Sequence, residues 1–291
     1  MDEINTALQI CPEAVVKIIS GFSRPVLAEL EEIRLRNGQP LSIVRCGKEQ
    51  IIPSLRADSR MLTDMMDRAS KQSAYSVQEL IKRGFLTVPG GHRLGICGRG
   101  IYKGGSLFSL REISSLNLRI AREIPGAADR AVSFLWTHPA STLIIGPPGR
   151  GKTTLLRDLI RQLSDRFSWR VCVSDERFEI ASCVDGLPQF SMGEHTDILS
   201  GIRKDEAIEI LLRTMNPQWI AVDEITAFSD VEEICRASYC GVRFLATAHA
   251  ACLKELESRP VYRKLMETRV FRNLIFIESD RSLHMEVVPN D

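Results

Sequence analysis

The pattern of apolar positions changes near residue 125. Beyond that point four short apolar runs recur, at residues 142–145, 170–174, 219–222 and 243–246. The stretches between them include one, 153–163, whose leucines and isoleucines fall on one helical face. Strands that alternate with helices predict a parallel sheet covered on both faces. A capping box of Ser229 and Glu232 is expected to open a helix ending at Gly241, and residues 274–288 are expected to form a terminal hairpin.

Before residue 125 the pattern is mixed. Residues 32–36 and 41–44 flank Asn37-Gly38, which predicts a β-hairpin because these two residue types accept the positive φ angles of its turn. Apolar side chains at 61, 62, 65, 66 and 69 have helical spacing and predict a helix that packs its methionines into the core. We therefore expect two domains: a smaller α+β domain over residues 1–125, with an interface or regulatory role, and an α/β domain over residues 126–291.

The segment from Val88 to Gly100 is rich in glycine and lies in a basic stretch. Between Glu79 and Glu112 there is no acidic residue, and the basic residues there are Lys82, Arg83, Arg93, Arg99, Lys103 and Arg111. One interpretation is a set of short strands joined by glycine turns, with solvated charges. The other is a basic surface that faces an anion, either the nucleotide of a neighbouring subunit or a nucleic acid. The sequence leaves both open.

Composition narrows the functional classes. The 291 residues include 38 basic and 37 acidic ones, so the net charge of +1 argues against a surface built wholly for nucleic acid or anionic lipid. The eight cysteines form no C-x-x-C pair, and we expect them to be small buried hydrophobic residues in a reducing cytosol. No signal-peptide pattern occurs, and no apolar run approaches the roughly 20 residues that span a bilayer. We expect a cytoplasmic protein whose membrane association, if any, comes through partners.

The most specific motif is the run Gly146-Pro147-Pro148-Gly149-Arg150-Gly151-Lys152-Thr153, which matches G-x-x-x-x-G-K-[ST] between a strand and an amphipathic helix. Glycines let successive N–H groups point at phosphate oxygens, and the helix presents its positive N-terminus to the same anion. Lys152 is expected to bind the β- and γ-phosphates of ATP, and Thr153 to place its hydroxyl on Mg²⁺. Thr154 completes the expected nucleotide-binding residues. The motif predicts a RecA/AAA-like P-loop ATPase domain.

A second motif supplies the acids that such a site needs. The apolar strand at 219–222 ends in Asp223-Glu224. Asp223 is expected to hold the Mg²⁺ shell, directly or through water. Glu224 points the other way from the strand tip, so it is expected to orient or deprotonate the attacking water. A strand followed by acids is common, and it is the accompanying P-loop that makes the pair informative.

Two further groups lie where ligands collect in open α/β sheets, at the ends of strands. Asp175 and Glu176 follow the strand at 170–174, and one of them is a candidate for completing the metal or water site. The alternative is an acid pair at the N-terminus of a helix. Thr247-Ala248-His249 follows the strand at 243–246, and His249 is a candidate sensor of the γ-phosphate through hydrogen bonding.

Together these residues resemble two related families. The second half resembles the traffic ATPases of type II and type IV secretion and pilus systems, through the P-loop, the acids at 175–176, the Leu-Arg-x-x-Asn-Pro stretch at 212–217 and the Thr-x-His box at 247–249. Nearly the whole chain resembles the stage III sporulation protein AA family. That likeness rests on residues 32–36, 88–98, 117–123, 146–153 and 175–181.

The resemblance implies a hexameric, ring-forming ATPase in the mother cell of a sporulating bacterium, which energises a secretion-like channel complex between mother cell and forespore. It also implies that ATP lies between the two domains and that arginines from the first domain or a neighbouring subunit neutralise the transferred phosphoryl group. The matching candidates are Arg119 and Arg213, followed by Arg93, Arg122 and Arg203. One departure concerns the acids: the secretion enzymes have Gly-Glu where this chain has Asp223-Glu224, which puts their metal ligation in doubt here.

Two other functions remain open at this point. A nucleic-acid-dependent ATPase would use the basic segment from Lys82 to Arg111 to contact phosphates, but nucleic acid is an unlikely partner because that segment has no aromatic cluster for stacking bases. A nucleotide-dependent switch that barely turns over would have no need of Glu224 beside Asp223.

Overall fold

The computed structural model describes residues 2–71 and 84–289. They form two compact units. The first comprises Met1–Arg122 together with Ser182–Phe190, and the second comprises Glu123–Ala181 together with Ser191–Asp291. The chain therefore passes between the units three times, and residues 182–190 belong to the first unit although they lie in the second half of the sequence.

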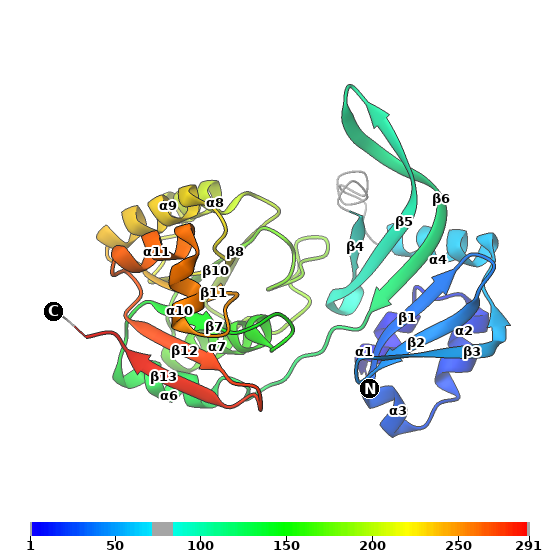
Figure 1. The fold of residues 1–291 in the computed structure, drawn as a ribbon, viewed down its shortest axis with the longest axis horizontal. Coiled ribbons are helices and arrows are strands. Elements are labelled where there is room, and N and C mark those ends of the chain that lie inside the picture. The colour runs from blue at the N-terminus through cyan, green and yellow to red at the C-terminus, as the bar shows by residue number, and fades with distance from the viewer. Residues whose placement is uncertain (1, 72–83, 290–291) are drawn as a thin grey trace. The chain divides into compact units, whose positions relative to one another are not determined.

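The first unit is built on a six-stranded antiparallel sheet with strand order β3-β2-β1-β6-β5-β4 (Figure 1). Its strands are β1 (Leu30–Arg36), β2 (Pro40–Arg45), β3 (Lys48–Arg56), β4 (Phe85–Val88), β5 (His92–Lys103) and β6 (Ser106–Arg119). Its helices are α1 (Asp2–Leu8), α2 (Glu13–Ser20), α3 (Arg24–Ala28) and α4 (Ser59–Lys71), with a short 3₁₀ turn, η1 (Pro89–Gly91).

The two local predictions for this unit are confirmed. β1 and β2 pair as the expected hairpin, and Gly38 in its turn has φ 73°, a value that glycine adopts without a steric penalty. The apolar stripe forms α4, which packs against β4 and β6. Leu62, Met65 and Ala69 on that stripe are buried, as core packing requires.

The segment 182–190 is attached to the first unit by close contacts. The N–H of Gly90 donates to Oε1 of Gln189 at 2.9 Å. The ring of Phe190 lies so close to Gly91 that a Cβ there would be 2.4 Å from its Cζ atom. Only a glycine at this position leaves room for the ring, and Phe190 is buried as a result.

The second unit contains a seven-stranded sheet with order β13-β12-β7-β11-β10-β8-β9. All its strands are parallel except β13, which pairs with β12 as the expected terminal hairpin. Their bounds are β7 (Thr142–Ile145), β8 (Val171–Asp175), β9 (Thr196–Ser200), β10 (Trp219–Glu224), β11 (Arg243–Ala248), β12 (Asn273–Ile277) and β13 (Leu283–Val287). The apolar runs identified in the sequence thus became neighbouring strands of one sheet.

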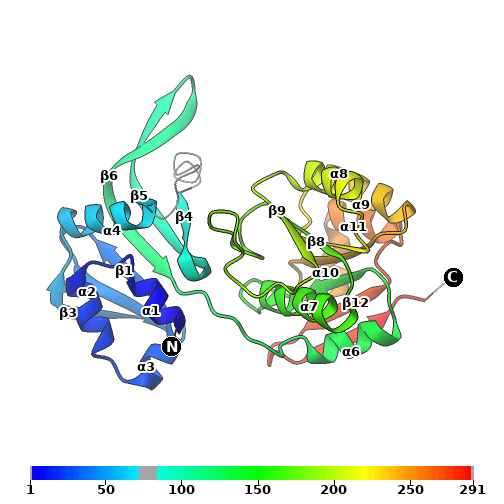
Figure 2. The same cartoon turned by 180° about the vertical axis from the view of Figure 1, so that it is seen from behind.

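Helices cover both faces of this sheet, as the strand–helix alternation predicted (Figures 1 and 2). They are α6 (Asp129–Thr137), α7 (Lys152–Phe167), α8 (Lys204–Thr214), α9 (Phe228–Tyr239), α10 (Leu253–Ser258) and α11 (Pro260–Glu267). α6 and α7 pack together on one side, and α8, α9 and α11 pack together on the other. Among the described residues, no helix is both long enough and apolar enough to cross a bilayer.

Two sequence expectations were wrong. The helix expected to open at Ser229 begins at Phe228, and its start is held by Asp230, whose carboxylate accepts the N–H groups of Thr226 and Ala227 at 3.1 Å. An acid at the third helical position thus does the capping. The cysteines were also expected to be buried. All of them are free, but only Cys11 and Cys172 are buried, whereas four are exposed and two are partly buried.

Candidate functional site

The P-loop leaves the carboxyl end of β7 and runs directly into α7. Gly149 and Gly151 have φ angles of 74° and 92°, in the left-handed region that favours glycine. No atom lies within 4 Å of where a Cβ would stand at either position. The backbone is therefore free to curl around an anion, and α7 presents its N-terminus to the space enclosed.

Lys152, the first residue of α7, is buried at 5% exposure and reaches back into this loop. Its ammonium donates to the carbonyl oxygens of Gly146 at 2.7 Å and Pro147 at 2.9 Å. Burial lowers the pKa of Lys152, while the nearby carboxylates of Glu224 and Asp223 act in the opposite direction. The loop thus holds one partly desolvated cation at the place where the motif predicts phosphate.

Strand order brings the acids and His249 to the same edge. β11 lies between β7 and β10, so the carboxyl ends of the P-loop strand and the acidic strand flank the Thr247-Ala248-His249 box. The hydroxyl of Thr247 donates to Oδ1 of Asp223 at 3.3 Å. His249 lies between Lys152 and Glu224, with Nδ1 2.8 Å from Nζ of Lys152 and Nε2 3.2 Å from Oε2 of Glu224.

The tautomer of His249 follows from its two partners. An ammonium only donates hydrogen bonds, so Nδ1 must accept from Lys152. A carboxylate only accepts, so Nε2 must carry the proton and donate it to Glu224. One neutral imidazole therefore connects the cation of the P-loop to the acid expected to handle water.

Asp175 and Glu176 occupy different surroundings. The fully buried carboxylate of Asp175 accepts the N–H groups of Glu179, Ile180 and Ala181 at 2.8–3.1 Å. No helix starts here, and the residues that follow form a turn in which Phe178 has φ 56°. Asp175 thus organises the turn backbone instead of sitting at a helix N-terminus.

Glu176 pairs with a residue that the sequence analysis missed. Its Oε2 atom lies 3.0 Å from Nζ of Lys204, which is 3% exposed in the first turn of α8. No motif flags a lone lysine 28 positions away in the sequence. Only the position of α8 in the fold reveals it.

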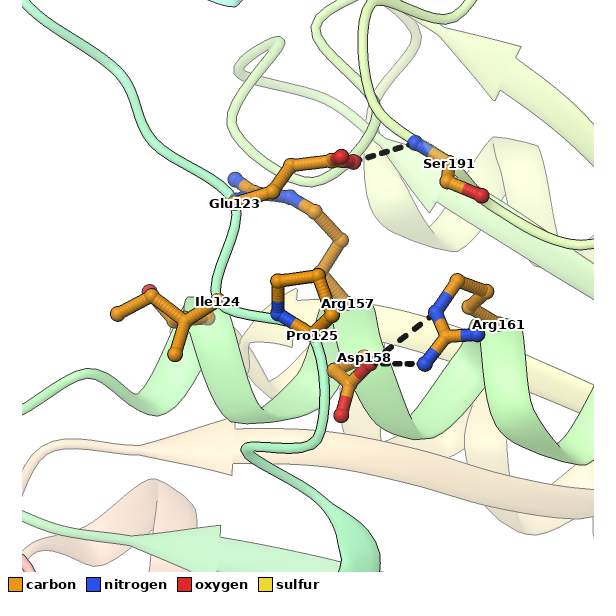
Figure 3. A pocket seen from close by; sticks show the side chains of 8 residues that line it. Glu123, Ile124, Pro125, Arg157, Asp158, Arg161 and Ser191 are labelled. Carbon is orange, nitrogen blue, oxygen red and sulfur yellow. Dashed lines mark hydrogen bonds and ion pairs between the residues drawn. The ribbon is translucent and has the colours of Figure 1, made fainter. Parts of the chain in front are cut away.

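The flank of α7 carries a pocket of about 160 Å³ that begins at Thr154 (Figure 3). Glu123 crosses it to accept the N–H of Ser191. Arg157 donates to the carbonyl oxygens of Ile180 at 2.7 Å and Glu179 at 2.9 Å, and burial lowers the pKa of its guanidinium to about 10. Arg157 thus ties the residues just before segment 182–190 to the P-loop helix, and Glu123 holds the residue just after that segment.

Comparisons with known proteins agree with this geometry. The profile of the family described as "Sporulation stage III, protein AA" matches residues 1–285. The chain belongs to this family. It is 35% identical over 273 residues to stage III sporulation protein AA of Bacillus subtilis (strain 168), covering 92% of this chain and 89% of the relative.

Solved structures show that the family member described here has the fold of secretion and pilus ATPases. The pilus retraction motor PilT with bound ADP matches with a TM-score of 0.63 at 18% identity, over 95% of this chain and 83% of that one. The ATPase DotB of Legionella pneumophila matches with a TM-score of 0.60 at 13% identity, over 94% and 79%. The likeness to secretion ATPases expected from the motifs is confirmed at the level of the fold.

The arginines that the family resemblance pointed to differ in how they are held. In the first unit, two Nη2 bonds tie Arg122 to the carbonyl oxygens of Leu27 and Leu30, and Arg93 lies 3.6 Å over the ring of Phe85. Arg119 is more loosely held, because its side chain is 64% exposed and its Nε is 3.7 Å from Glu32.

The remaining two candidates lie in the second unit. Arg203 pairs with Asp205 and Arg213 pairs with Glu209 at 2.6 Å, both on or beside α8. The structure therefore leaves Arg119 as the candidate with the weakest competing contact. Lys82 and Arg83, part of the basic stretch, lie outside the described residues.

The donor atoms at the P-loop fit Mg²⁺ bound together with a nucleotide. Thr153 and Asp223 offer a hydroxyl and a carboxylate, the hard oxygen ligands that Mg²⁺ prefers. Among residues 2–71 and 84–289, no three His, Cys, Asp or Glu side chains cluster as a complete metal cage.

Proposed function

We propose that this protein is a Mg²⁺-dependent ATPase that assembles into a hexameric ring and energises a secretion-like channel complex between mother cell and forespore. The observation that carries the proposal is the connection of Lys152, His249 and Glu224 across three neighbouring strand ends. In this proposal Lys152 binds phosphate and Glu224 activates water, and the two side chains contact opposite sides of one imidazole.

Each residue of the site has a distinct role in this proposal. Lys152 exchanges its bonds to the Gly146 and Pro147 carbonyls for phosphate oxygens. Thr153 and Asp223 hold Mg²⁺, which when bound neutralises charge on the phosphates. Thr247 donates to Asp223 and so keeps that carboxylate oriented.

Glu224 acts on the attacking water. It accepts the water proton as the oxygen attacks the γ-phosphate, and ADP leaves with the bridging electrons. His249 donates to Glu224 through Nε2 and so orients that carboxylate. Its Nδ1 atom accepts from Lys152, so Nδ1 changes its partner when Lys152 binds phosphate. His249 is thus a positioning residue that links phosphate binding to the water-activating group.

In this proposal a neighbouring subunit of the ring supplies the arginine that completes each site. Arg119 provides positive charge to the transferred phosphoryl group of a neighbouring subunit, because its side chain is exposed and loosely paired. The named neighbours are a pilus retraction motor and the ATPase DotB, which supports a mechanical, ATP-driven role. The family description, "Sporulation stage III, protein AA", supports a role for that machine in sporulation.

The test is the steady-state ATPase rate per subunit measured against protein concentration. The blank is Lys152→Ala and the matched control is Lys254→Ala, which removes an exposed lysine of α10. A ring with shared sites predicts specific activity that rises steeply with concentration. A chain that hydrolyses ATP as a monomer would overturn the ring, and the absence of turnover at every concentration would overturn the ATPase.

Mixing two inactive variants tests the role of Arg119 directly. In a one-to-one mixture of Lys152→Ala and Arg119→Ala chains, about one interface in four combines an intact P-loop with an intact arginine, if assembly is random. Recovery of about that fraction of the wild-type rate is expected. If the mixture stays inactive while Arg119→Ala alone is inactive, Arg119 acts within its own subunit.

A further inference from the structure

The first unit carries a two-stranded arm. β4 pairs with β5 only over His92–Gly95, and β1 pairs with β6 only over Ser115–Arg119. Beyond these residues β5 and β6 pair only with each other among the described strands, and Figures 1 and 2 show this hairpin extending past the rest of its unit. Beyond these residues β5 has eight residues and β6 has nine, which at about 3.3 Å per residue give an arm on the order of 25–30 Å long.

Apolar side chains are concentrated at the end of this arm. Tyr102 is 70% exposed and Phe108 is 39% exposed, on either side of the Gly104-Gly105 turn. Ile101, Leu107 and Leu110 nearby are only partly buried. Isolated exposed apolar residues need no explanation, but five within a few positions of one turn form a patch.

Two local devices shape this tip. Gly100 leaves room for the side chains of Tyr102 and Leu107 to pack over it. A Cβ at this position would stand 3.5 Å from the Tyr102 ring and 3.2 Å from Leu107. The strand register shifts between the Ile101–Ser109 pair and the Tyr102–Leu107 pair, which makes Phe108 the extra residue of a β-bulge. A bulge turns its extra side chain away from the regular alternation, so apolar groups emerge in more than one direction.

Positive charge lies both at the tip and behind it: Lys103 is the last residue before the Gly104-Gly105 turn, and Arg99 and Arg111 face each other further back along the arm. The arm contains Arg99, Lys103 and Arg111 against one acid, Glu112, which pairs with Arg99 at 3.2 Å. Nζ of Lys103 lies 5.4 Å over the ring of Phe108. Apolar side chains interleaved with a terminal lysine and backed by two arginines suit the boundary of an anionic bilayer, where a long lysine side chain can reach the headgroups while its neighbours contact hydrocarbon.

We propose that the tip of the β5–β6 arm inserts into the headgroup region of an anionic lipid bilayer. Tyr102, Phe108 and their neighbours enter the interface, while Lys103 at the turn and Arg99 and Arg111 behind the patch meet lipid phosphates. The arm cannot go deeper, because the outer edges of its two strands leave N–H and C=O groups that need water. Five apolar side chains near one turn favour lipid over nucleic acid, because a nucleic-acid backbone offers charged phosphates and not hydrocarbon.

Vesicle co-sedimentation of the full chain tests this. Wild type is expected to sediment with vesicles containing phosphatidylglycerol and not with pure phosphatidylcholine, less so at high salt. The pair Tyr102→Ser and Phe108→Ser should weaken binding at least about tenfold. Arg99→Gln and Lys103→Gln should each weaken it about fivefold. The matched control, Tyr239→Ser, removes a side chain that is 84% exposed in the second unit and should change nothing.

A second measurement locates the contact. Phe108→Trp adds a reporter to a chain whose three native tryptophans all lie in the second unit. Its emission, taken as the difference from wild type, should shift to shorter wavelength with anionic vesicles. No vesicle binding, binding that survives the double tip substitution, or retention of duplex DNA in place of vesicles would each overturn the proposal. None of these outcomes depends on ATP hydrolysis.

Discussion

The sheets of the two units keep their polar residues in different places. In the second unit β7, β8, β10 and β11 are buried almost throughout, and the groups suited to phosphate chemistry appear where these strands end. In the first unit β3 is exposed along most of its length, and so are the outer parts of β5 and β6. A covered parallel sheet collects its chemistry at one edge, whereas an open antiparallel sheet spreads it over a surface.

Glu224→Gln is confined to the edge of the parallel sheet and should have the largest effect. It removes the carboxylate proposed to activate water, so kcat should fall about 10²- to 10⁴-fold. Nucleotide affinity and Tm should stay near wild type, because Lys152 and Thr153 are untouched. Single-turnover rates measure the chemical step, binding titrations measure nucleotide affinity, and thermal unfolding measures Tm. A variant that hydrolyses ATP at the wild-type rate would mean that another group activates water.

Asp175→Asn tests whether a buried acid at the same edge is structural. The amide places an NH₂ group among three N–H donors, so the free energy of unfolding should fall by about 3–4 kcal/mol. Denaturant unfolding measures the loss, and Asp197→Asn on the adjacent strand β9 is the control. If Asp175→Asn unfolds like wild type but loses catalysis, Asp175 belongs to the reaction after all.

In the first unit His92 should make stability depend on pH. It is fully buried, its Nδ1 accepts the N–H of Ala121 at 3.0 Å, and burial lowers its pKa to about 4. The unfolded chain, with a histidine pKa of about 6.5, binds the proton first as pH falls. Between pH 6.5 and 4 the unfolding free energy should therefore drop, by about 2–3 kcal/mol in total.

The variant His92→Asn isolates this contribution, because its side-chain oxygen can still accept from Ala121 and it does not titrate. Its unfolding free energy should fall less steeply than that of wild type over the same pH range. Parallel pH profiles for the two chains would show that His92 is not the titrating group.

Tyr102→Ser should have the smallest effect of all. Its side chain is largely exposed on the arm, so the unfolding free energy should change by less than about 0.5 kcal/mol. ATPase activity without vesicles should also be unchanged. A large fall in Tm would show that the arm tip is packed against another part of the protein. The outer parts of β5 and β6 would then be less exposed than the contrast with the second sheet requires.

The same contrast explains what could be read from the sequence. The P-loop, Asp223, Glu224 and His249 were accessible because each follows a buried apolar run, and parallel strands bring such positions to one edge. The roles of Asp175 and Lys204 were not, because their partners are backbone N–H groups of a turn and an acid on another element. The length of the arm was hidden as well, since glycines at 95, 98 and 100 suggested short strands with turns, yet all three lie within β5.

Because residues 182–190 belong to the first unit, the protein cannot be divided into two fragments by a single cut in the chain. A fragment that begins at Glu123 would retain Phe190 and Gln189 but lose the glycines of η1 that receive them. Conversely, a fragment that ends at Arg122 would lack Phe190, so the surface of Gly91 that its ring covers would be exposed to water. Neither half is a self-sufficient module, so expressing the two as separate polypeptides should yield aggregation unless nine residues are grafted from one gene segment to the other.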